Sequence, residues 1–312
     1  MKIGITLLTL APLLSVAVHS EAAVMAYDGF SSADGNASAS ENLAGQASGT
    51  GFSGAWTASE TGNERDLLSF QQPTGTDTMT FPSGTGYTPS ETTQRHHAGS
   101  SGGGYGEGHY YRALSSSISM DTDGEATYVS WLGRLGGTDS ANAVGLGKLN
   151  GTSGVDGGTP TNITFGMGNY FRNGGGLLGA GPWAITTDKG TNGFGSILAS
   201  TKDASGPYAA INTTYYMVGK ITTSSTGNDT IQFSWYAPGD TVPLAESWML
   251  TGSADLTGDY DYLSINAGGF SDSRFDEIRV ADTWESAVAP VPEPSSTLLL
   301  GLSSVVFFRR RR

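Results

Sequence analysis

The residues of this chain that could do chemistry are mostly carboxylates, and their spacing decides whether two of them can act on the same bond. Two carboxylates that act on one bond must share a face of a strand, where side chains alternate with a period of two. Asp276 and Glu277 are adjacent, and we expect them to point to opposite faces. Asp121, Asp123 and Glu125 do alternate, but Gly124 and neighbouring Ser and Thr residues indicate a turn. Neither set predicts a catalytic pair.

Histidine and cysteine chemistry has little basis in this sequence. Adjacent His96 and His97 would diverge on a strand, and we interpret Arg95, His96 and His97 as an exposed loop before a glycine-rich segment. The chain contains no cysteine, which excludes disulfides, cysteine nucleophiles and thiolate metal sites. We therefore expect stability to come from a core of adequate size, and no enzyme activity is predicted from these residues.

One acidic residue lies in a pattern typical of a buried strand. Strand alternation puts Asp276 on the same face as Ile278 and Val280, so a core-facing strand would bury the carboxylate. Such a group must be hydrogen-bonded or must coordinate a metal ion. Asp28 is the natural second acid if the two ends of the domain meet. We predict a structural calcium ion at Asp28 and Asp276; the alternative is that backbone amides of a turn satisfy Asp276.

Aromatic residues are the remaining chemical signal. Sugar rings stack on exposed Trp and Tyr, but aromatic residues also supply large buried areas to a sandwich core. The chain has six tryptophans, and we expect most of them to be buried. Trp183 follows Gly181 and Pro182 and precedes a polar strand, so it is the predicted exposed tryptophan and the candidate glycan-binding residue.

The composition narrows both the fold and the partners. The chain has 46 glycines in 312 residues, together with abundant Ser and Thr, which disfavours long helices and suits short strands joined by tight turns. A hydrophobic content of 37% is enough for a core. The net charge of −13 should repel phosphate backbones, so we exclude nucleic acid as a partner.

Alternating patterns recur along the body of the chain. Residues 126–132, 215–222 and 230–236 are rich in aromatic and β-branched residues, and Ile231, Phe233 and Trp235 share one face. Turn residues at 224–229 predict a hairpin between the last two segments. Later strands are expected at 262–265 and 274–280. Because no linker interrupts these patterns, we predict a single β-sandwich domain over residues 26–288.

The two ends of the chain have a different character. Lys2, an uncharged run over 3–18 and small residues at Ser20 and Ala22 predict a signal peptide, residues 1–22. Residues 289–312 contain Pro292, Glu293 and Pro294, then an uncharged stretch over 295–308, and end in four arginines, Arg309, Arg310, Arg311 and Arg312. As a helix, the uncharged stretch spans about 21 Å, less than the ~30 Å core of a bilayer, which suits a temporary anchor.

This tail resembles the PEP-CTERM sorting signal of Gram-negative bacteria, with its Pro-Glu-Pro motif, short apolar helix and arginine cluster in that order. The resemblance implies an exported protein of the cell envelope, cell surface or extracellular matrix, transiently held at the inner membrane. It also implies recognition by an exosortase-type processing enzyme. Carriers of this signal often accompany exopolysaccharide production, so an extracellular polysaccharide is an expected partner.

The body resembles the concanavalin A-like, laminin-G-like jelly rolls of exported bacterial proteins. The resemblance rests on residues 27–30, 51–56 and 275–280, with Thr283 and Trp284. It implies an all-β, jelly-roll β-sandwich. The same architecture includes β-glucanases with a Glu-x-Asp-x-x-Glu strand, a pattern absent here. We therefore expect a matrix or adhesion protein with weak glycan affinity; the alternative is a glycan-active hydrolase or lyase.

Overall fold

The computed structural model describes residues 24–30, 43–47, 49–58, 68–71, 79, 95–98, 107–136, 141–148, 163–168, 182–187, 197–201, 208–268 and 273–288. These residues form fifteen strands and one short helix. The predicted signal peptide and the predicted apolar helix of the tail both lie outside this part of the chain. No helix within it is long and apolar enough to cross a membrane.

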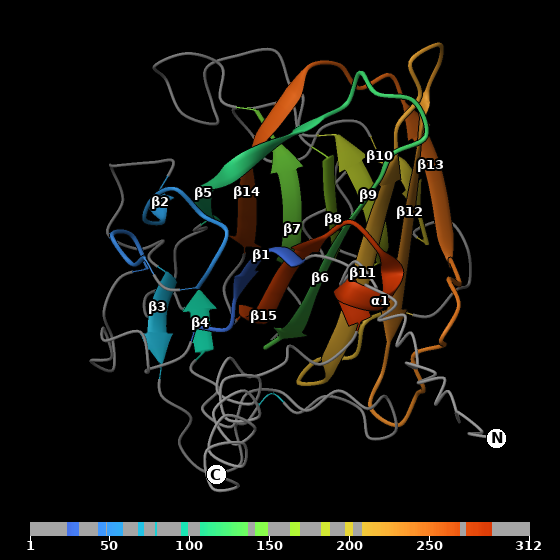
Figure 1. Ribbon diagram of the computed structural model, residues 1–312. Helices are drawn as coiled ribbons and strands as arrows, with labels where there is room; N and C mark the ends of the chain where they lie inside the picture. The colour runs from blue at the N-terminus through green and yellow to red at the C-terminus, as the bar shows by residue number, and fades with distance from the viewer. Residues whose placement is uncertain are drawn as a thin grey trace, which may run out of the picture.

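The strands form two antiparallel sheets that pack face to face (Figure 1). The first sheet has the order β13 (Leu250–Ala254), β12 (Asp229–Tyr236), β11 (Thr214–Thr222), β6 (Ala126–Leu135), β15 (Ser273–Ala281), β4 (Arg95–Ala98) and β3 (Leu68–Gln71), while β1 (Val24–Asp28) also pairs with β15. The second sheet has the order β10 (Ile197–Ser200), β9 (Trp183–Thr187), β8 (Ile163–Gly168), β7 (Ala141–Gly147), β14 (Asp259–Gly268), β5 (Glu107–Ser119) and β2 (Thr57–Ala58). The prediction of an all-β, concanavalin A-like jelly-roll sandwich is confirmed: nearly all of the regular secondary structure of the described residues is strand, and the strands form two layers.

The predicted hairpin is confirmed as β11 and β12. Ile221 pairs with Ile231, and Gly219 pairs with Phe233. Ile231 and Phe233 are buried in the core between the sheets, and Trp235 is on the same face, as the alternation predicts. Gly219 has no side chain because the ring of Phe165 from the opposite sheet occupies that space, with its Cδ2 atom 2.6 Å from where a Cβ would lie.

One local prediction was wrong. Residues Arg95–Ala98 are strand β4, not an exposed loop, and they pair with β15 on one side and β3 on the other. The glycine-rich segment after them has loop composition, but strand formation here depends on neighbours distant in sequence. Hydrogen bonding to the edges of β15 and β3 stabilises a strand here, although the local sequence favours a turn.

A second, smaller apolar cluster, the outer cluster, covers the outer face of the first sheet. Its buried members are Met79, Tyr128, Leu132, Tyr216, Val218, Tyr236, Val242, Ala281, Trp284 and Ala287. The helix α1 (Trp284–Val288) packs across β6 and β15 (Figure 1). The carbonyl oxygen of Ala287 accepts hydrogen bonds from Ser130 Oγ at 2.8 Å and from Tyr216 Oη at 2.6 Å. Trp284 Nε1 donates to the carbonyl oxygen of Pro243 at 3.0 Å. These contacts hold the last described turn of the chain against the sheet.

Candidate functional site

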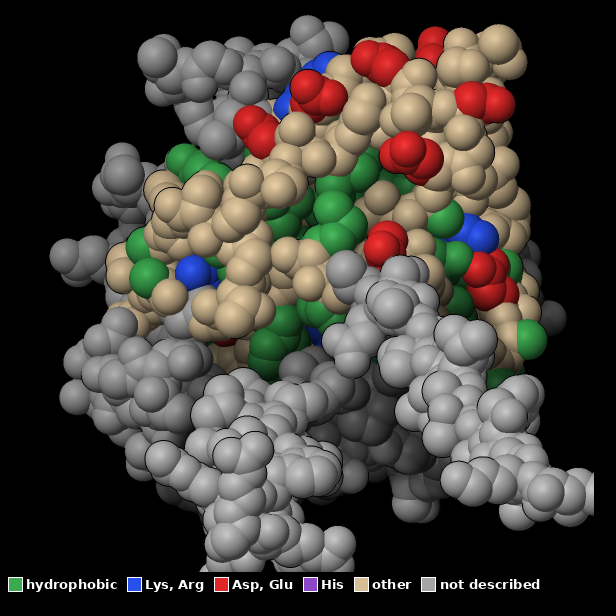
Figure 2. All heavy atoms as spheres, viewed as in Figure 1, with side chains coloured by type: hydrophobic (Ala, Val, Ile, Leu, Met, Phe, Trp, Pro, Cys, Tyr) green, Lys and Arg blue, Asp and Glu red, His purple; other side chains and the backbone are tan. Residues whose placement is uncertain are grey.

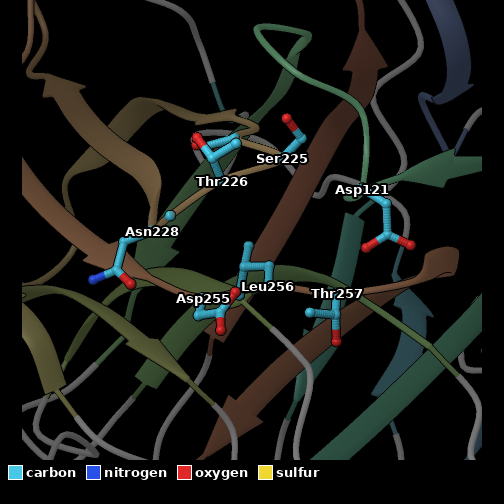
Figure 3. Close-up of a pocket in the computed structure, with 9 residues that line it drawn as sticks. Asp121, Ser225, Thr226, Asn228, Asp255, Leu256 and Thr257 are labelled. Carbon is cyan, nitrogen blue, oxygen red and sulfur yellow. The ribbon is translucent and has the colours of Figure 1, made fainter.

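The candidate ligand site is a polar pocket of about 350 Å³ at one end of the sandwich. It is built by the loops that join β5 to β6, β11 to β12, and β13 to β14. Figure 3 shows the labelled lining residues, which come from these loops and lie around the pocket. The lining residues are Asp121, Ser224, Ser225, Thr226, Gly227, Asn228, Asp255, Leu256 and Thr257.

A buried carboxylate, Asp229, joins two of the loops. Its Oδ1 atom accepts a hydrogen bond from the backbone amide of Ser224 at 2.8 Å, and its Oδ2 atom accepts one from Leu256 at 2.6 Å. Asp229 is the first residue of β12 and is fully buried. A carboxylate bonded to two amides in this way fixes both loops relative to the strand.

The third loop is tied to the other two in the same manner. Asp121 Oδ1 accepts from the amide of Gly258 at 3.0 Å, and Asp123 Oδ1 accepts from the amide of Ser225 at 3.2 Å. Gly124 and Gly258 both have φ of +77°, a conformation that glycine adopts without strain. The pocket is therefore held together by cross-loop hydrogen bonds before any ligand enters.

The charge around the pocket is strongly negative. Figure 2 shows acidic side chains grouped over this end of the molecule. The exposed members are Asp121, Asp123, Glu125, Asp255 and Asp259. One basic group, Lys148 Nζ, donates to the carbonyl oxygen of Thr257 at 2.8 Å. Such a field disfavours anionic ligands and favours groups that donate hydrogen bonds.

Asp28, one of the two predicted calcium ligands, is bonded to the protein itself. Its Oδ2 atom accepts from Trp56 Nε1 at 2.9 Å and from Arg112 Nη1 at 2.8 Å, and its Oδ1 atom accepts from the amide of Phe30 at 3.0 Å. Asp28 is 0% exposed and Arg112 is 3% exposed. Because β1 and β5 belong to different sheets, this ion pair joins the two layers.

Asp276, the other predicted ligand, lies on the opposite face of the sheet from Asp28. The register of β15 against β6 shifts between Asp276 and Arg279, and Glu277 there has a φ of +53°. Asp276 pairs with Leu132 of the outer cluster, whereas Asp28 pairs with Ile278 of the core between the sheets. The predicted alternation was wrong, because a β-bulge adds one residue to β15. Side chains after the bulge therefore point to the opposite face from the one that strict alternation predicts.

The two acids therefore do not lie in one site, and the prediction that Asp28 and Asp276 together bind a calcium ion was wrong. The Oδ1 atom of Asp276 accepts a hydrogen bond from the amide of Glu277 at 2.8 Å. This is the backbone alternative that the sequence left open. Among the residues that the structure describes, no group of three or more His, Asp or Glu side chains is placed to hold a metal ion.

The bulge also buries a polar cluster beneath the outer face. Glu277 Oε2 accepts from Tyr27 Oη at 3.0 Å and lies 3.4 Å from Arg279 Nη2. The guanidinium of Arg279 lies over the ring of Tyr27, 5.6 Å from its centre. Burial, and after it the Glu277 carboxylate, raise the pKa of the Tyr27 hydroxyl above its usual value. The hydroxyl therefore remains a hydrogen-bond donor at neutral pH.

Trp183 was wrongly predicted to be exposed. It is 0% exposed and stacks on Trp235, with ring centres 4.4 Å apart and planes tilted by 7°. Tyr215 packs against it edge-on at 4.9 Å. The glycine and proline before it suggested a surface turn, but the ring projects between the two sheets. Trp183 is therefore a core residue and no longer a candidate for glycan binding.

The pocket itself was missed by the sequence analysis. Its loops are far apart in the chain. Two of them were interpreted only as turns, at 121–125 and 224–229, and no prediction was made for the third, at 255–257. The turns themselves are confirmed. The three loops lie together because antiparallel pairing brings the end of β5 and the beginnings of β12 and β14 to the same end of the sandwich.

Residues 290–312 match the family model of the PEP-CTERM protein-sorting motif. This confirms the interpretation of the tail and indicates an exported protein sorted to the cell envelope. The match covers the tail only. No curated protein sequence matches the chain.

Several solved structures are similar to parts of this chain at low sequence identity. The carbohydrate recognition domain of Emp46p in its metal-free form is 12% identical, covering 56% of this chain and 78% of that chain, with a TM-score of 0.35. The alginate lyase Aly36B is 13% identical, covering 61% and 81%, with a TM-score of 0.38. The globular domain of T. cruzi calreticulin is 10% identical, covering 75% and 86%, with a TM-score of 0.38.

Proposed function

We propose that this protein is an envelope-sorted matrix or adhesion component whose loop pocket binds a neutral glycan weakly. The observation that carries the proposal is the pre-organised polar pocket, whose volume of about 350 Å³ suits one or two sugar rings. Sugar hydroxyls donate to carboxylates and accept from amide and hydroxyl groups. Asp121 and Asp255 supply the acceptors, while Asn228, Thr226 and Thr257 supply mixed donors and acceptors.

Weak affinity follows from what the described part of the pocket offers. No aromatic residue is among its lining residues, so the stacking surface that strengthens many sugar sites is missing there. The surrounding carboxylates oppose uronates and sulfated sugars. A neutral polysaccharide with repeated units would compensate through several weak contacts made at once by many copies of the protein.

The glycan proposal is tested on a glycan array with the body of the chain, residues 23–290. Asp121→Asn and Asp255→Asn should each reduce binding to neutral glycans, because each removes a charged acceptor from the pocket. Glu125→Gln is the matched control, since Glu125 belongs to the same acidic end but does not line the pocket. Binding that falls equally in all three variants would show a general charge effect and contradict the site.

The alternative function is a glycan-active hydrolase or lyase at the same pocket. It is favoured by one observation, that two carboxylates, Asp121 and Asp255, line one cavity. The body of the chain is incubated with neutral polysaccharides, which a hydrolase could cleave, and with uronate-containing polysaccharides, which a lyase requires. Appearance of new reducing ends or unsaturated products, abolished by Asp121→Asn, would establish the enzyme. Binding without product supports the proposal.

For the tail, we propose transient insertion into the inner membrane and recognition by an exosortase-type enzyme. The sorting motif at 290–312 supports this, together with an uncharged stretch that is short for a permanent anchor. Replacing Pro292, Glu293 and Pro294 by alanine should leave a precursor in the inner membrane. Fractionation and mass measurement check the result, and an unchanged mature protein would contradict it.

A further inference from the structure

The loop between β12 and β13, residues 237–249, presents an apolar tip to solvent. Leu244 is 101% exposed and Met249 is 49% exposed, and they are the exposed large hydrophobic residues among those the structure describes. A single exposed leucine is ordinary on a protein surface.

The loop is anchored on both sides of Leu244. Before it, Val242 is buried in the outer cluster, and the carbonyl oxygen of Pro243 accepts the hydrogen bond from Trp284 Nε1. After it, Glu246 accepts from Lys220 Nζ at 2.7 Å, from Trp248 Nε1 at 3.1 Å and from Tyr128 Oη. Leu244 is therefore held outward by its neighbours.

The same anchor places the loop beside the exit of the sorting tail. Trp284, which bonds to the loop, is the first residue of α1, and α1 ends at Val288. Residues 289–294 separate Val288 from Ser295, where the uncharged stretch begins. An extended segment of this length spans at most about 25 Å. A tail inserted in a bilayer must keep Val288, the end of α1, within that distance of the lipid, and the loop is bonded to the same helix through Trp284.

The loop and the ligand pocket lie at opposite ends of the same two strands. β12 begins at Asp229 beside the pocket and ends at Tyr236, where the loop begins; β13 returns from the loop to Asp255. A strand of this length spans roughly 26 Å. In Figure 1 the pocket loops lie at the top, and the β12–β13 loop lies at the lower right near α1.

We propose that the tip at Leu244 rests on the lipid bilayer while the tail is inserted, so that the acidic pocket end faces away from the membrane. This rests on the membrane insertion of the tail proposed above. The loop also has exposed carboxylates at Asp240 and Glu246, so electrostatic attraction to anionic lipid does not drive the contact. The tether supplies the proximity, and the apolar tip supplies the contact.

The absence of cysteine makes a site-specific probe straightforward. Leu244→Cys is labelled with an environment-sensitive fluorophore in the full chain, which is then reconstituted into phosphatidylcholine vesicles containing a spin-labelled lipid quencher. Thr226→Cys, an exposed position at the pocket end, is the matched control. We expect a blue shift and quenching for the label at position 244 and neither for the label at position 226.

Vesicle flotation separates the two proposals. Protein that floats with the vesicles but gives equal quenching at both positions retains the tether and overturns the docking. Protein that does not float overturns both the tether and the docking. A blue shift at position 244 that appears without lipid and grows with protein concentration would identify a second copy of the chain as the occupant, which also overturns the docking.

Discussion

At the scale of single residues, the buried contact between Asp28 and Arg112 is the clearest link between the sheets. Both side chains are almost fully buried, and Arg112 also donates from Nε to the carbonyl oxygen of Gly54 at 2.6 Å. The guanidinium lies over the ring of Phe52, 4.2 Å from its centre. If either charged side chain were buried in the core without its partner, the free energy of unfolding would fall strongly.

We predict that Arg112→Met lowers the free energy of unfolding by about 3–5 kcal/mol, because it leaves the Asp28 carboxylate buried without its counter-ion. Urea unfolding followed by circular dichroism measures the loss. Arg134→Met serves as the control, since Arg134 is partly exposed and its hydrogen bond to Asn212 Oδ1 is at the surface. Equal losses in the two variants would contradict the role of the buried pair.

Buried tyrosines predict a decline of stability at high pH. Burial raises the pKa of Tyr216 to about 12 and the pKa of Tyr236 to about 12. In the unfolded chain tyrosine ionises near pH 10. Between pH 10 and 12 the unfolded state therefore binds fewer protons than the folded state, so the free energy of unfolding falls as pH rises.

This prediction is measured as the urea midpoint at a series of pH values. The midpoint should be steady below about pH 10 and fall above it. Tyr216→Phe should reduce the steepness of the fall, although its stability at neutral pH will be lower because the bond to the Ala287 carbonyl oxygen is lost. A midpoint that does not change between pH 10 and 12 would refute the argument.

The burial of Trp183 leads to a separate prediction. Trp183→Ala should cost about 3–5 kcal/mol of stability, since it removes a ring stacked on Trp235 and opens a cavity between the sheets. Glycan binding at the distant pocket should be unaffected once the protein is folded. A variant of normal stability that has lost glycan binding would restore the original interpretation of this tryptophan.

At the scale of elements, strand β15 decides how the two ends of the chain meet. One edge of β15 pairs with β6 along most of its length; the other is shared by β4, opposite residues 273–275, and β1, opposite residues 278–281. The bulge at Glu277 lies where the partner changes. It keeps Phe275, Ile278 and Val280 in the core between the sheets.

We predict that insertion of one alanine between Glu277 and Ile278 prevents folding, because a second extra residue would turn Ile278 and Val280 outward and put Arg279 into the core. Glu277→Gly is the control: glycine adopts the positive φ easily, so this variant should fold with a stability lower by about 3 kcal/mol from the lost partner of Arg279. Near-ultraviolet circular dichroism distinguishes the two outcomes. An insertion variant with a native spectrum would show that the number of residues at the bulge does not decide which side chains of β15 face the core.

At the scale of the whole molecule, the pairing of β1 with β15 closes the first sheet with the two ends of the body. Ala26 pairs with Val280, and both belong to the core between the sheets. Elements from the beginning, middle and end of the chain contribute to that core. A stable half-domain would have to expose a large part of it.

We therefore predict that residues 26–288 unfold as one cooperative unit. Calorimetry should give one transition, and limited proteolysis should trim the ends and exposed loops while the sandwich stays whole. Two stable fragments, or two resolved transitions, would show that the body is divided into separate domains.

The sequence by itself determined the features that depend on neighbouring residues. Alternation and turn residues predicted the β11–β12 hairpin, the all-β class and the turns at 121–125 and 224–229. The tail was identified from its own order of prolines, uncharged residues and arginines, and the match to the sorting motif confirms it. Each of these signals is complete within a short stretch, so no knowledge of distant contacts is needed.

Only the tertiary structure decided the features that depend on contacts across the chain. One additional residue at Glu277 put Asp276 on the opposite face from Asp28, and no local pattern marks that bulge. Trp183 is buried because Trp235 and Tyr215 from the other sheet cover it. The pocket exists because antiparallel pairing brings three separate turns together, and side-chain facing and loop convergence are set by partners that the local sequence does not contain.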